Sequence, residues 1–238
     1  MSQLIIRDLR PEDREQVRRV CFETGMMGES IADQYRDFDS FADMFTRYYT
    51  DIEPENSVVA ELDGKIVGYM LCALDERKAK TPTAYMLQHA LTRGACFRPG
   101  TFGFYVRAAL DSITDLFGPR APKLDLDQYP SAPHINLLPE ARRYGGGSEM
   151  FYRVFDHIVS RGSKGMHGAI VASNRPMFEF ATKKIGCVAV GDPYPVIGLR
   201  DKQGKRVNLQ TIVIALNDWE VGAWKKPSFR GYVPSASA

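Results

Sequence analysis

Cysteine is scarce in this sequence, and long hydrophobic runs are absent. The four cysteines lie far apart and form no CxxC pair: Cys21, Cys72, Cys96 and Cys187. Residues 1–10 show no signal-peptide pattern, so the sequence predicts reduced thiols in a cytoplasmic protein. The longest purely apolar runs, such as 212–216, are far too short to cross a bilayer. We therefore expect neither a disulfide scaffold nor a membrane partner.

Histidine and net charge are low as well. The four histidines share no ligand spacing with the cysteines, so we expect no metal site. The net charge is +2, and no motif combines basic with aromatic residues. A nucleic-acid partner is therefore disfavoured.

Charge is unevenly distributed along the chain. Residues 1–63 hold seven arginines and no lysine against fifteen acids, a net charge of −8, whereas residues 76–123 have a net charge of +5. Such an asymmetry either steers ligands through local fields or reflects two solvated faces of opposite sign. The sequence leaves both interpretations open.

Hydrophobic periodicity and turn residues predict an alternation of strands and helices. Asp63-Gly64 between two β-rich runs predicts a hairpin of 57–62 with 65–74. Further strands are expected at 3–9, 133–138, 169–172, 188–190, 196–199 and 207–216, and helices from 10 to Gly25 and at 35–49, 148–160 and 175–185. Residues 76–123 are expected to form a helical insertion (84–95, 106–117), a lid or dimer surface, within a domain spanning 1–218. Residues 219–238 are predicted to be a loose tail.

A glycine-rich loop joins the strand at 133–138 to the helix at 148–160. Glycines let the backbone approach a phosphate, and the first N–H groups of a helix bind anions. Residues Arg142–Ser148 have this form, and Arg142 and Arg143 can add charge-assisted contacts. A P-loop is excluded because no Gly-Lys-Ser/Thr follows, and the GxGxxG fingerprint of dinucleotide folds is missing.

The segment Leu137-Leu138-Pro139-Glu140-Ala141-Arg142-Arg143-Tyr144-Gly145-Gly146-Gly147 resembles the acetyl-CoA motif of the GNAT (GCN5-related N-acetyltransferase) superfamily. That motif is written apolar-x-Pro-x-x-(Arg/Gln)-x-x-Gly-x-(Gly/Ala). Asn174 and the helix that ends at Gly186 are similar to a second family block, and the hairpin with Val67-Gly68-Tyr69 is similar to a third. The resemblance covers about residues 3–75 and 133–216. It implies an α/β fold with a mixed, mostly antiparallel, bent sheet flanked by helices.

The resemblance also implies roles for single residues, with acetyl-CoA as cosubstrate. The backbone at Leu137 and Leu138 would bind the pantetheine arm, and Asn174 would contact it from the far side. The pyrophosphate would bind along Arg143, Tyr144, Gly145, Gly146, Gly147 and Ser148. The reaction implied is direct attack of a neutral amine on the thioester.

Two departures from the family pattern concern the helix at 175–185. Many members place a Tyr four residues before the helix-ending Gly as general acid, and here that position is Thr182. The block is also one residue longer than usual between Asn174 and Gly186. The identity of the acid and the role of Asn174 are therefore open.

His134, on the strand that enters the motif, is the candidate general base, since its intrinsic pKa suits proton transfer near neutrality. A strand histidine satisfied by a neighbour is the alternative. Tyr194 and Tyr152 are candidate replacements for the acid. Asp125, Asp127 and Tyr129 could line the acceptor mouth, whereas Glu140, His157 and His167 are expected on the surface or in turns.

The acceptor is left open by the sequence. In this family the first two helices wall the acceptor site, and their acidic character here favours a cationic amine: a small molecule first, a protein lysine second. The basic insertion could instead cover the CoA phosphates or bind an anionic acceptor. A homodimer and a catalytically inactive acyl-CoA-binding domain are further hypotheses.

Overall fold

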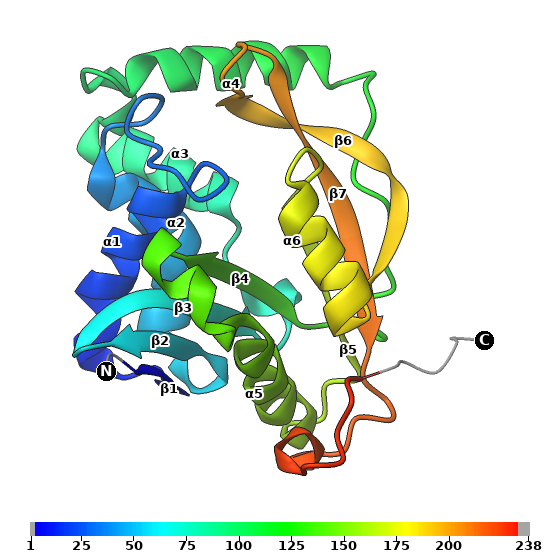
Figure 1. The fold of residues 1–238 in the computed structure, drawn as a ribbon. Helices are drawn as coiled ribbons and strands as arrows, with labels where there is room; N and C mark the ends of the chain where they lie inside the picture. Colours follow the sequence, from blue (N-terminus) through cyan, green and yellow to red (C-terminus); the bar gives the residue numbers. More distant parts are fainter. Residues whose placement is uncertain (1–2, 233–238) are drawn as a thin grey trace.

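Two antiparallel sheets stand side by side in a computed structural model of the protein, which describes residues 3–232 (Figure 1). The first sheet has the order β1-β2-β3-β4, with bounds Leu4–Asp8, Val58–Leu62, Lys65–Ala73 and Ala132–Leu137. The second has the order β5-β7-β6, with bounds Gly165–Val171, Arg206–Ala215 and Val188–Arg200. They join at one isolated parallel bridge, Ser131 to Met166, and within the described residues β4 and β5 pair no further. This confirms the predicted α/β class with mostly antiparallel strands, and it shows that the strands divide into two sheets.

The predicted hairpin of β2 and β3 is confirmed. Its two turn residues, Asp63 and Gly64, have φ angles of 49° and 78°. Positive φ at both central positions is the geometry that matches the twist of the flanking strands. Apart from its first residue, β3 is buried along its whole length because helices cover both faces of the first sheet.

Helices α1 (Arg14–Thr24) and α2 (Phe38–Asp51) lie against β3, and α5 (Gly146–Ser160) packs on β1, β2 and β3 (Figure 1). The apolar stripe that the sequence predicts for α5 is buried: Met150, Phe151, Val154, Phe155 and Ile158. No helix within residues 3–232 combines the length and the apolar character that crossing a membrane would need.

The extra residue before Gly186 has a structural explanation. Helix α6 covers Arg175–Glu179 and continues as a π-helix over Phe180–Ile185, which ends at Gly186 with a φ of 93°. A π-turn holds one residue more than an α-turn, so it absorbs a single insertion without moving either end of the helix.

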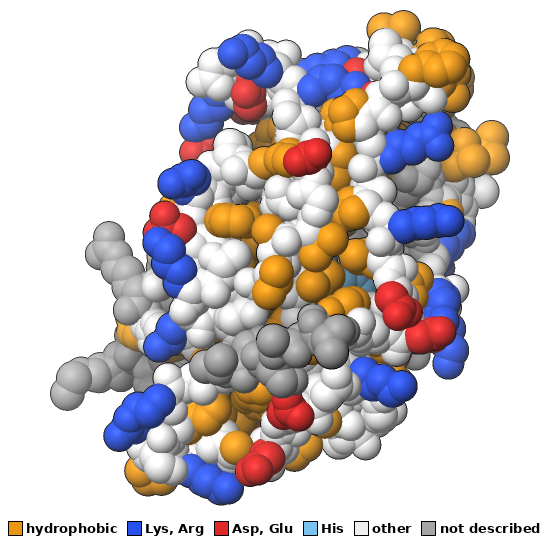
Figure 2. All heavy atoms as spheres, turned by 90° about the vertical axis from the view of Figure 1, so that its right-hand side faces the viewer, with side chains coloured by type: hydrophobic (Ala, Val, Ile, Leu, Met, Phe, Trp, Pro, Cys, Tyr) orange, Lys and Arg blue, Asp and Glu red, His pale blue; other side chains and the backbone are white. Residues whose placement is uncertain are grey.

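The insertion is helical, as predicted, with α3 at Pro82–Arg93 and α4 at Phe102–Thr114. Helix α3 packs on α2, and α4 runs across the end of β6 (Figure 1). Many large apolar side chains of this segment are exposed, including Leu91, Phe97, Leu110, Ile113 and Phe117. Figure 2 shows hydrophobic side chains protruding at the top of the molecule, where α4 lies in Figure 1. A role of this face as lid or dimer surface stays a prediction.

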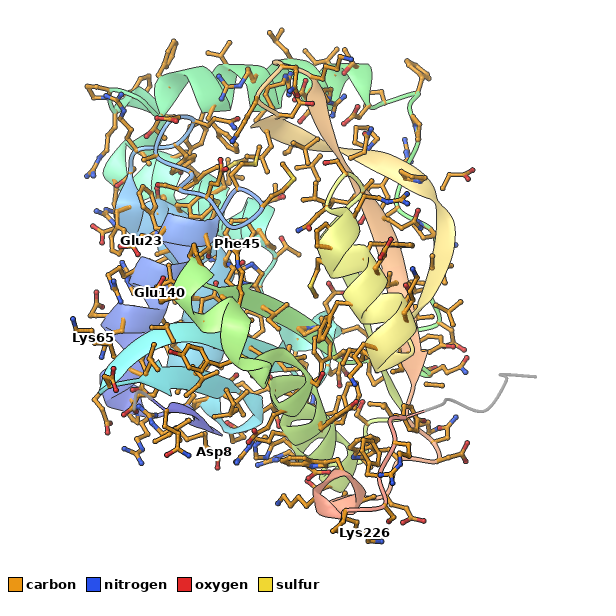
Figure 3. All side chains as sticks on the ribbon, viewed as in Figure 1. Asp8, Glu23, Phe45, Lys65, Glu140 and Lys226 are labelled. Atoms are coloured by element: carbon orange, nitrogen blue, oxygen red, sulfur yellow. The ribbon has the colours of Figure 1, made fainter. Side chains whose placement is uncertain are left out.

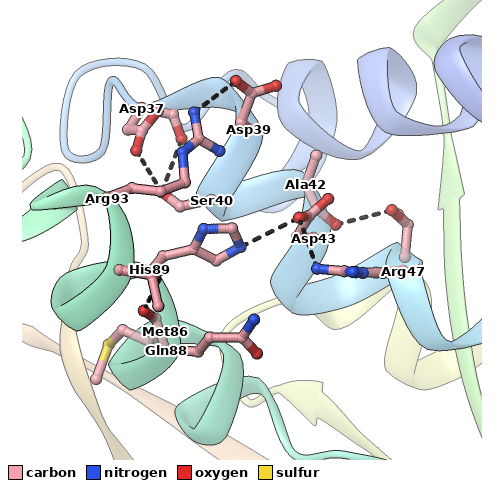
Figure 4. A network of polar contacts seen from close by, with 12 residues as sticks. Asp37, Asp39, Ser40, Ala42, Asp43, Arg47, Met86, Gln88, His89 and Arg93 are labelled. Carbon is pink, nitrogen blue, oxygen red and sulfur yellow. Dashed lines mark hydrogen bonds and ion pairs between the residues drawn. The ribbon is translucent and has the colours of Figure 1, made fainter.

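A histidine hydrogen bond and two ion pairs dock the basic insertion onto the acidic first two helices and the residue before α2. His89 on α3 bonds Asp43 on α2 at 3.1 Å, and Arg93 bonds Asp39 at 2.9 Å (Figure 4). Arg98, which follows α3, bonds the buried Asp37 at 2.9 Å. The opposite charges of residues 1–63 and 76–123 therefore partly neutralise each other inside the molecule. Neither interpretation offered by the sequence, steering fields or two solvated faces, included a direct contact between these two segments.

The segment after residue 218 is packed rather than loose up to residue 232. The indole N–H groups of Trp219 and Trp224 both donate to the Asp156 carboxylate on α5, at 2.9 and 2.8 Å. Trp219 is buried, and Tyr232 donates to the carbonyl of Ala215 at 2.7 Å. The prediction of a loose tail is therefore wrong for 219–232, and residues 233–238 lie outside the described part. The reason is that two tryptophans share one carboxylate from a distant helix.

Candidate functional site

Beyond the Ser131–Met166 bridge, the edge of β4 that faces β5 pairs with no strand of the described residues. The N–H of Leu138 donates to the carbonyl of Val67 at 2.8 Å. Because bonded positions alternate along an antiparallel strand, the backbone groups of Asn136 and His134 also bond β3. The backbone N–H and C=O groups of Ile135 and Leu137 consequently point away from β3, toward the opening where β5 has separated. Of the two leucines proposed to hold a pantetheine arm, Leu137 faces this opening and Leu138 does not. Only the register of β4 could have revealed that difference.

The glycine-rich loop leads from this edge into α5. A 3-10 segment over Pro139–Tyr144 is followed by Gly145 in the left-handed region, with a φ of 72°, and α5 starts at Gly146. No side chain of the described residues caps the helix, and a Cβ at Gly145 would meet nothing within 4 Å. The first N–H groups of a 15-residue helix therefore lie behind an open backbone, which is the arrangement that binds phosphate.

The other residues of the loop have mixed surroundings. A Cβ at Gly146 would lie 2.6 Å from Cδ2 of Leu4, so packing on β1 already explains that glycine. A Cβ at Gly147 would lie 3.3 Å from the ring of Phe180. Tyr144 is exposed and Ser148 is half-buried. The side chain of Arg143 lies outside the described part of the structure.

Arg142 binds the protein itself. Its Nε and Nη2 donate to the carbonyl of Leu137 at 3.1 and 3.0 Å, and Nη2 also donates to the carbonyl of Gly28 at 3.3 Å. The side chain therefore fastens the loop to the end of β4 and to the connection between α1 and α2. Its Nη1 makes no hydrogen bond among the described residues, so a contact of Arg142 with a phosphate stays a prediction.

The connection between α1 and α2, residues 25–37, extends across the opening. On one side of the opening, the carbonyl of Gly28 accepts a bond from Arg142. On the other side, the sulfur of Met27 lies 3.5 Å from the hydroxyl of Ser173, just before α6. Asn174 accepts the N–H of Met177 at 3.3 Å and so caps α6. The proposed contact of Asn174 with the cosubstrate stays a prediction.

His134 lies in an aromatic environment. Its ring stacks on Phe45 of α2 at 5.2 Å between centroids, and its Nδ1 lies 3.2 Å from the hydroxyl of Tyr69. Phe45 lies on the side of α2 toward the second sheet (Figure 3). Asn136 donates to the same hydroxyl at 2.8 Å. Burial lowers the pKa of His134 to about 4. The sequence did not identify Tyr69 as a site residue. The pairing of β3 with β4 places it opposite Asn136 and beside His134.

These contacts make His134 a weak base at neutral pH. Since Asn136 donates to the Tyr69 oxygen, the Tyr69 proton is free to point at Nδ1 of His134, which leaves the ring proton on Nε2. The ring is then neutral and a hydrogen-bond donor at Nε2. A base with a pKa of about 4 has little driving force to take a proton from an ammonium group.

The lowered pKa of His134 predicts loss of stability in acid. The unfolded chain binds a proton at this histidine near pH 6.5, whereas the folded chain does so only near 4. The contribution is therefore fully present above pH 6.5 and is lost as the pH falls toward 4, by up to about 3 kcal/mol. Denaturant unfolding of the wild type and of His134→Gln at pH 7 and pH 4 measures it. Equal acid sensitivity of the two proteins would contradict the assignment.

The candidate acids lie away from His134. Tyr194 is half-buried on β6, the outer strand of the second sheet. Strand β7 lies between β6 and β5, so β6 is about 10 Å from β5 at a strand spacing of about 4.8 Å. Tyr152 is buried against Trp219 with their rings stacked at 5.6 Å. The Thr182 hydroxyl donates to the carbonyl of Phe178 in its own helix. The structure does not bring His134 and Tyr194 together.

The remaining candidates cluster at the closed end, where the sheets join. Asp127 pairs with Arg77 at 2.8 Å, and Asp125 accepts N–H bonds within its own turn. His167, expected on the surface, is buried and bonds the carbonyl of Tyr129 at 2.7 Å and Glu76 at 2.9 Å. Burial lowers its pKa, but the bond and charge of Glu76 raise it by more, so the net shift is upward. Glu140 is exposed, as expected. His157 is half-buried at the surface and bonds Asp8.

A cavity of about 420 Å³ lies between residues 25–37, α4 and the turn that joins β6 to β7. Its walls are strongly ionic: Met26, Met27, Glu29, Ser30, Asp33, Gln34, Arg107, Arg200, Asp201 and Lys202. These residues come from three segments that are distant in sequence, so the sequence alone did not indicate that they form one site. No group of three or more His, Cys, Asp or Glu within residues 3–232 could hold a metal ion.

No protein-family model matches the sequence. Among solved structures, the chain is similar to SsHAT, with 20% identity, a TM-score of 0.59, and coverage of 90% of this chain and 98% of that one. It is also similar to YncA from Salmonella typhimurium, solved with its cofactor acetyl-CoA (14%, TM-score 0.54, 92% and 98%). A third is the GNAT superfamily phosphinothricin acetyltransferase from Sinorhizobium meliloti in complex with acetyl-CoA (18%, TM-score 0.54, 96% and 95%). The chain therefore has the GNAT fold.

Proposed function

We propose that this protein is an acetyl-CoA-dependent N-acetyltransferase that acts on a small amine by direct transfer. The observation that carries the proposal is the free edge of β4 leading into the open, uncapped start of α5 at Gly145. Solved structures with this fold include acetyltransferases in complex with acetyl-CoA, which supports the same cosubstrate here.

The residues present fit acetyl-CoA. Backbone groups of Ile135 and the backbone N–H of Leu137 would hold the amide arm in the opening, since Arg142 already occupies the Leu137 carbonyl. The first N–H groups of α5 would hold the pyrophosphate. These are backbone contacts, so they depend on strand register and on Gly145 rather than on a particular side chain.

In the proposed reaction the neutral amine attacks the thioester carbonyl carbon. A C–N bond forms, the C–S bond breaks, and the amine proton passes through solvent to the departing thiolate. In this proposal His134 is neutral and does not remove the proton, because burial lowers its pKa to about 4. The ionic cavity beside residues 25–37 favours a small acceptor, with a protein lysine as the alternative.

Calorimetric titration with acetyl-CoA, followed by an amine screen that detects released thiol, tests the proposal. We expect roughly stoichiometric binding in the micromolar range, about −8 kcal/mol, and turnover with at least one small amine. Binding without turnover on any amine or lysine peptide would favour an inactive acyl-CoA-binding domain, the reading motivated by Thr182. No binding by a folded sample would overturn the proposal.

A further inference from the structure

Arg107, on α4 of the insertion, lines the cavity with a guanidinium that is mostly unpaired. Its Nε donates to the carbonyl of Gly198 at 3.1 Å. Its Nη2 is buried and has no hydrogen-bond partner among the described residues. A guanidinium has five N–H donors, and an unpaired buried charge is costly. The position is therefore one where an incoming anion would be stabilised.

The charged neighbours of Arg107 are already paired. Arg200 makes a bidentate pair with Asp111, with both N–O distances at 2.7 Å. Lys202 bonds Glu29 at 2.8 Å. The carboxylate of Asp201 accepts the backbone N–H groups of Gln203 and Lys205, each at 2.9 Å. Burial and the charge of Arg200 lower the pKa of Arg107. Among the cavity cations, Arg107 is thus the one that lacks an acidic partner in the described structure.

The cavity adjoins the elements proposed to hold acetyl-CoA. Met27, in its wall, contacts Ser173 at the start of α6, and the next residue, Gly28, contacts Arg142 of the glycine-rich loop. The cavity therefore lies next to both elements, and an acceptor bound in it is close to the opening between the sheets. Asp33, in the same wall, is exposed and has no bonded partner within the described residues, so it is available to an ammonium group.

We propose that the acceptor amine carries an anionic group, a carboxylate or a phosphate, that binds Arg107. The inference rests on the proposed function and specifies its substrate class. A zwitterionic molecule of amino-acid size fits a cavity of about 420 Å³, with its anion at Arg107 and its ammonium near Asp33. A charge-assisted bond to a buried guanidinium also distinguishes such a molecule from a plain polyamine.

Matched acceptors test the inference. The panel consists of 2,4-diaminobutyrate and its decarboxylated counterpart 1,3-diaminopropane, and of phosphoethanolamine and ethanolamine. We expect the wild type to favour one anionic member over its partner by about 30-fold or more in kcat/KM, since a charged hydrogen bond contributes about 2 kcal/mol. Arg107→Gln should remove that preference mainly through KM. The carboxylate and phosphate pairs show which anion is recognised.

Two controls keep the outcomes distinct. Arg120→Gln removes an exposed cation of the same insertion and should leave the preference unchanged. Titration of wild type and Arg107→Gln with acetyl-CoA should give equal affinities. Weaker acetyl-CoA binding in the variant would assign Arg107 to the CoA phosphates and overturn the inference, as would equal losses for charged and uncharged acceptors. If the wild type fails to bind acetyl-CoA, the proposed function falls, whereas calorimetry with the anionic amines alone still tests Arg107.

Discussion

Replacing Gly145 with valine is expected to weaken acetyl-CoA binding by about 100-fold or more, equivalent to about 2.7 kcal/mol. Gly145 has a φ of 72°, which a β-branched residue adopts only with strain. The new side chain would also stand in open space, directly before the first N–H groups of α5. Both effects act on the phosphate cradle, and neither removes a packing contact from the core. Calorimetric titration with acetyl-CoA measures the loss.

The matched control is Gly162→Val at the opposite end of the same helix. Gly162 has a φ of 88°, and a Cβ there would also meet nothing within 4 Å. The two variants should therefore lose similar stability in a denaturant titration, while only Gly145→Val loses affinity. If both bind acetyl-CoA like the wild type, the cradle is elsewhere. Gly147→Val is a less direct probe because its side chain would press on Phe180.

Asp43→Asn is expected to destabilise the fold by about 3 kcal/mol, since it leaves a buried arginine without its principal counter-charge. Asp43 accepts bonds from Arg18 on α1 and from His89 on α3, and all three residues are less than a tenth exposed. An amide at this position is neutral and presents one acceptor oxygen instead of two. Thermal unfolding should show a decrease in Tm of about 6–12 °C at this chain length.

Asp51→Asn on the same helix is the control. Asp51 pairs with Arg14 at 2.8 Å, but both side chains are about one third exposed, so solvent screens the pair and its loss should cost under about 1 kcal/mol. Equal effects of the two substitutions would show that the α1–α2–α3 network contributes no more than a surface pair. The docking of the insertion would then depend on its apolar contacts and on the remaining pairs of Arg93 with Asp39 and of Arg98 with Asp37.

Much of the candidate site follows from local sequence. Glycines at 145–147 between a strand and a helix specify an open helix start, and Asp63-Gly64 specifies the hairpin that pairs β2 with β3. These features depend on the φ preferences of a few adjacent residues, which remain the same in any fold. Strand register is less local. It decided that Leu137 rather than Leu138 faces the opening, and that Tyr69 lies beside His134.

Other features depend on residues distant in sequence. Arg142 donates to two backbone carbonyls, those of Leu137 and Gly28, which the sequence did not indicate, and its contact with a phosphate stays a prediction. His167 was placed on the surface, whereas Glu76 holds it buried. The acidic character of the first two helices implied a field for a cationic acceptor, yet the basic insertion neutralises part of it.

The sequence by itself determined the fold class, the hairpin and the glycine-rich loop, because turn conformation and hydrophobic periodicity are set by neighbouring residues. The tertiary structure alone decided which charges remain unpaired. Arg107, Arg200 and Lys202 are equivalent cations in the sequence. The packing of α4 against β6 pairs Arg200 with Asp111, and the connection between α1 and α2 pairs Lys202 with Glu29, whereas Arg107 has no acidic partner among the described residues. The energy of a charge depends on its partners and on its burial, and both are properties of the assembled fold.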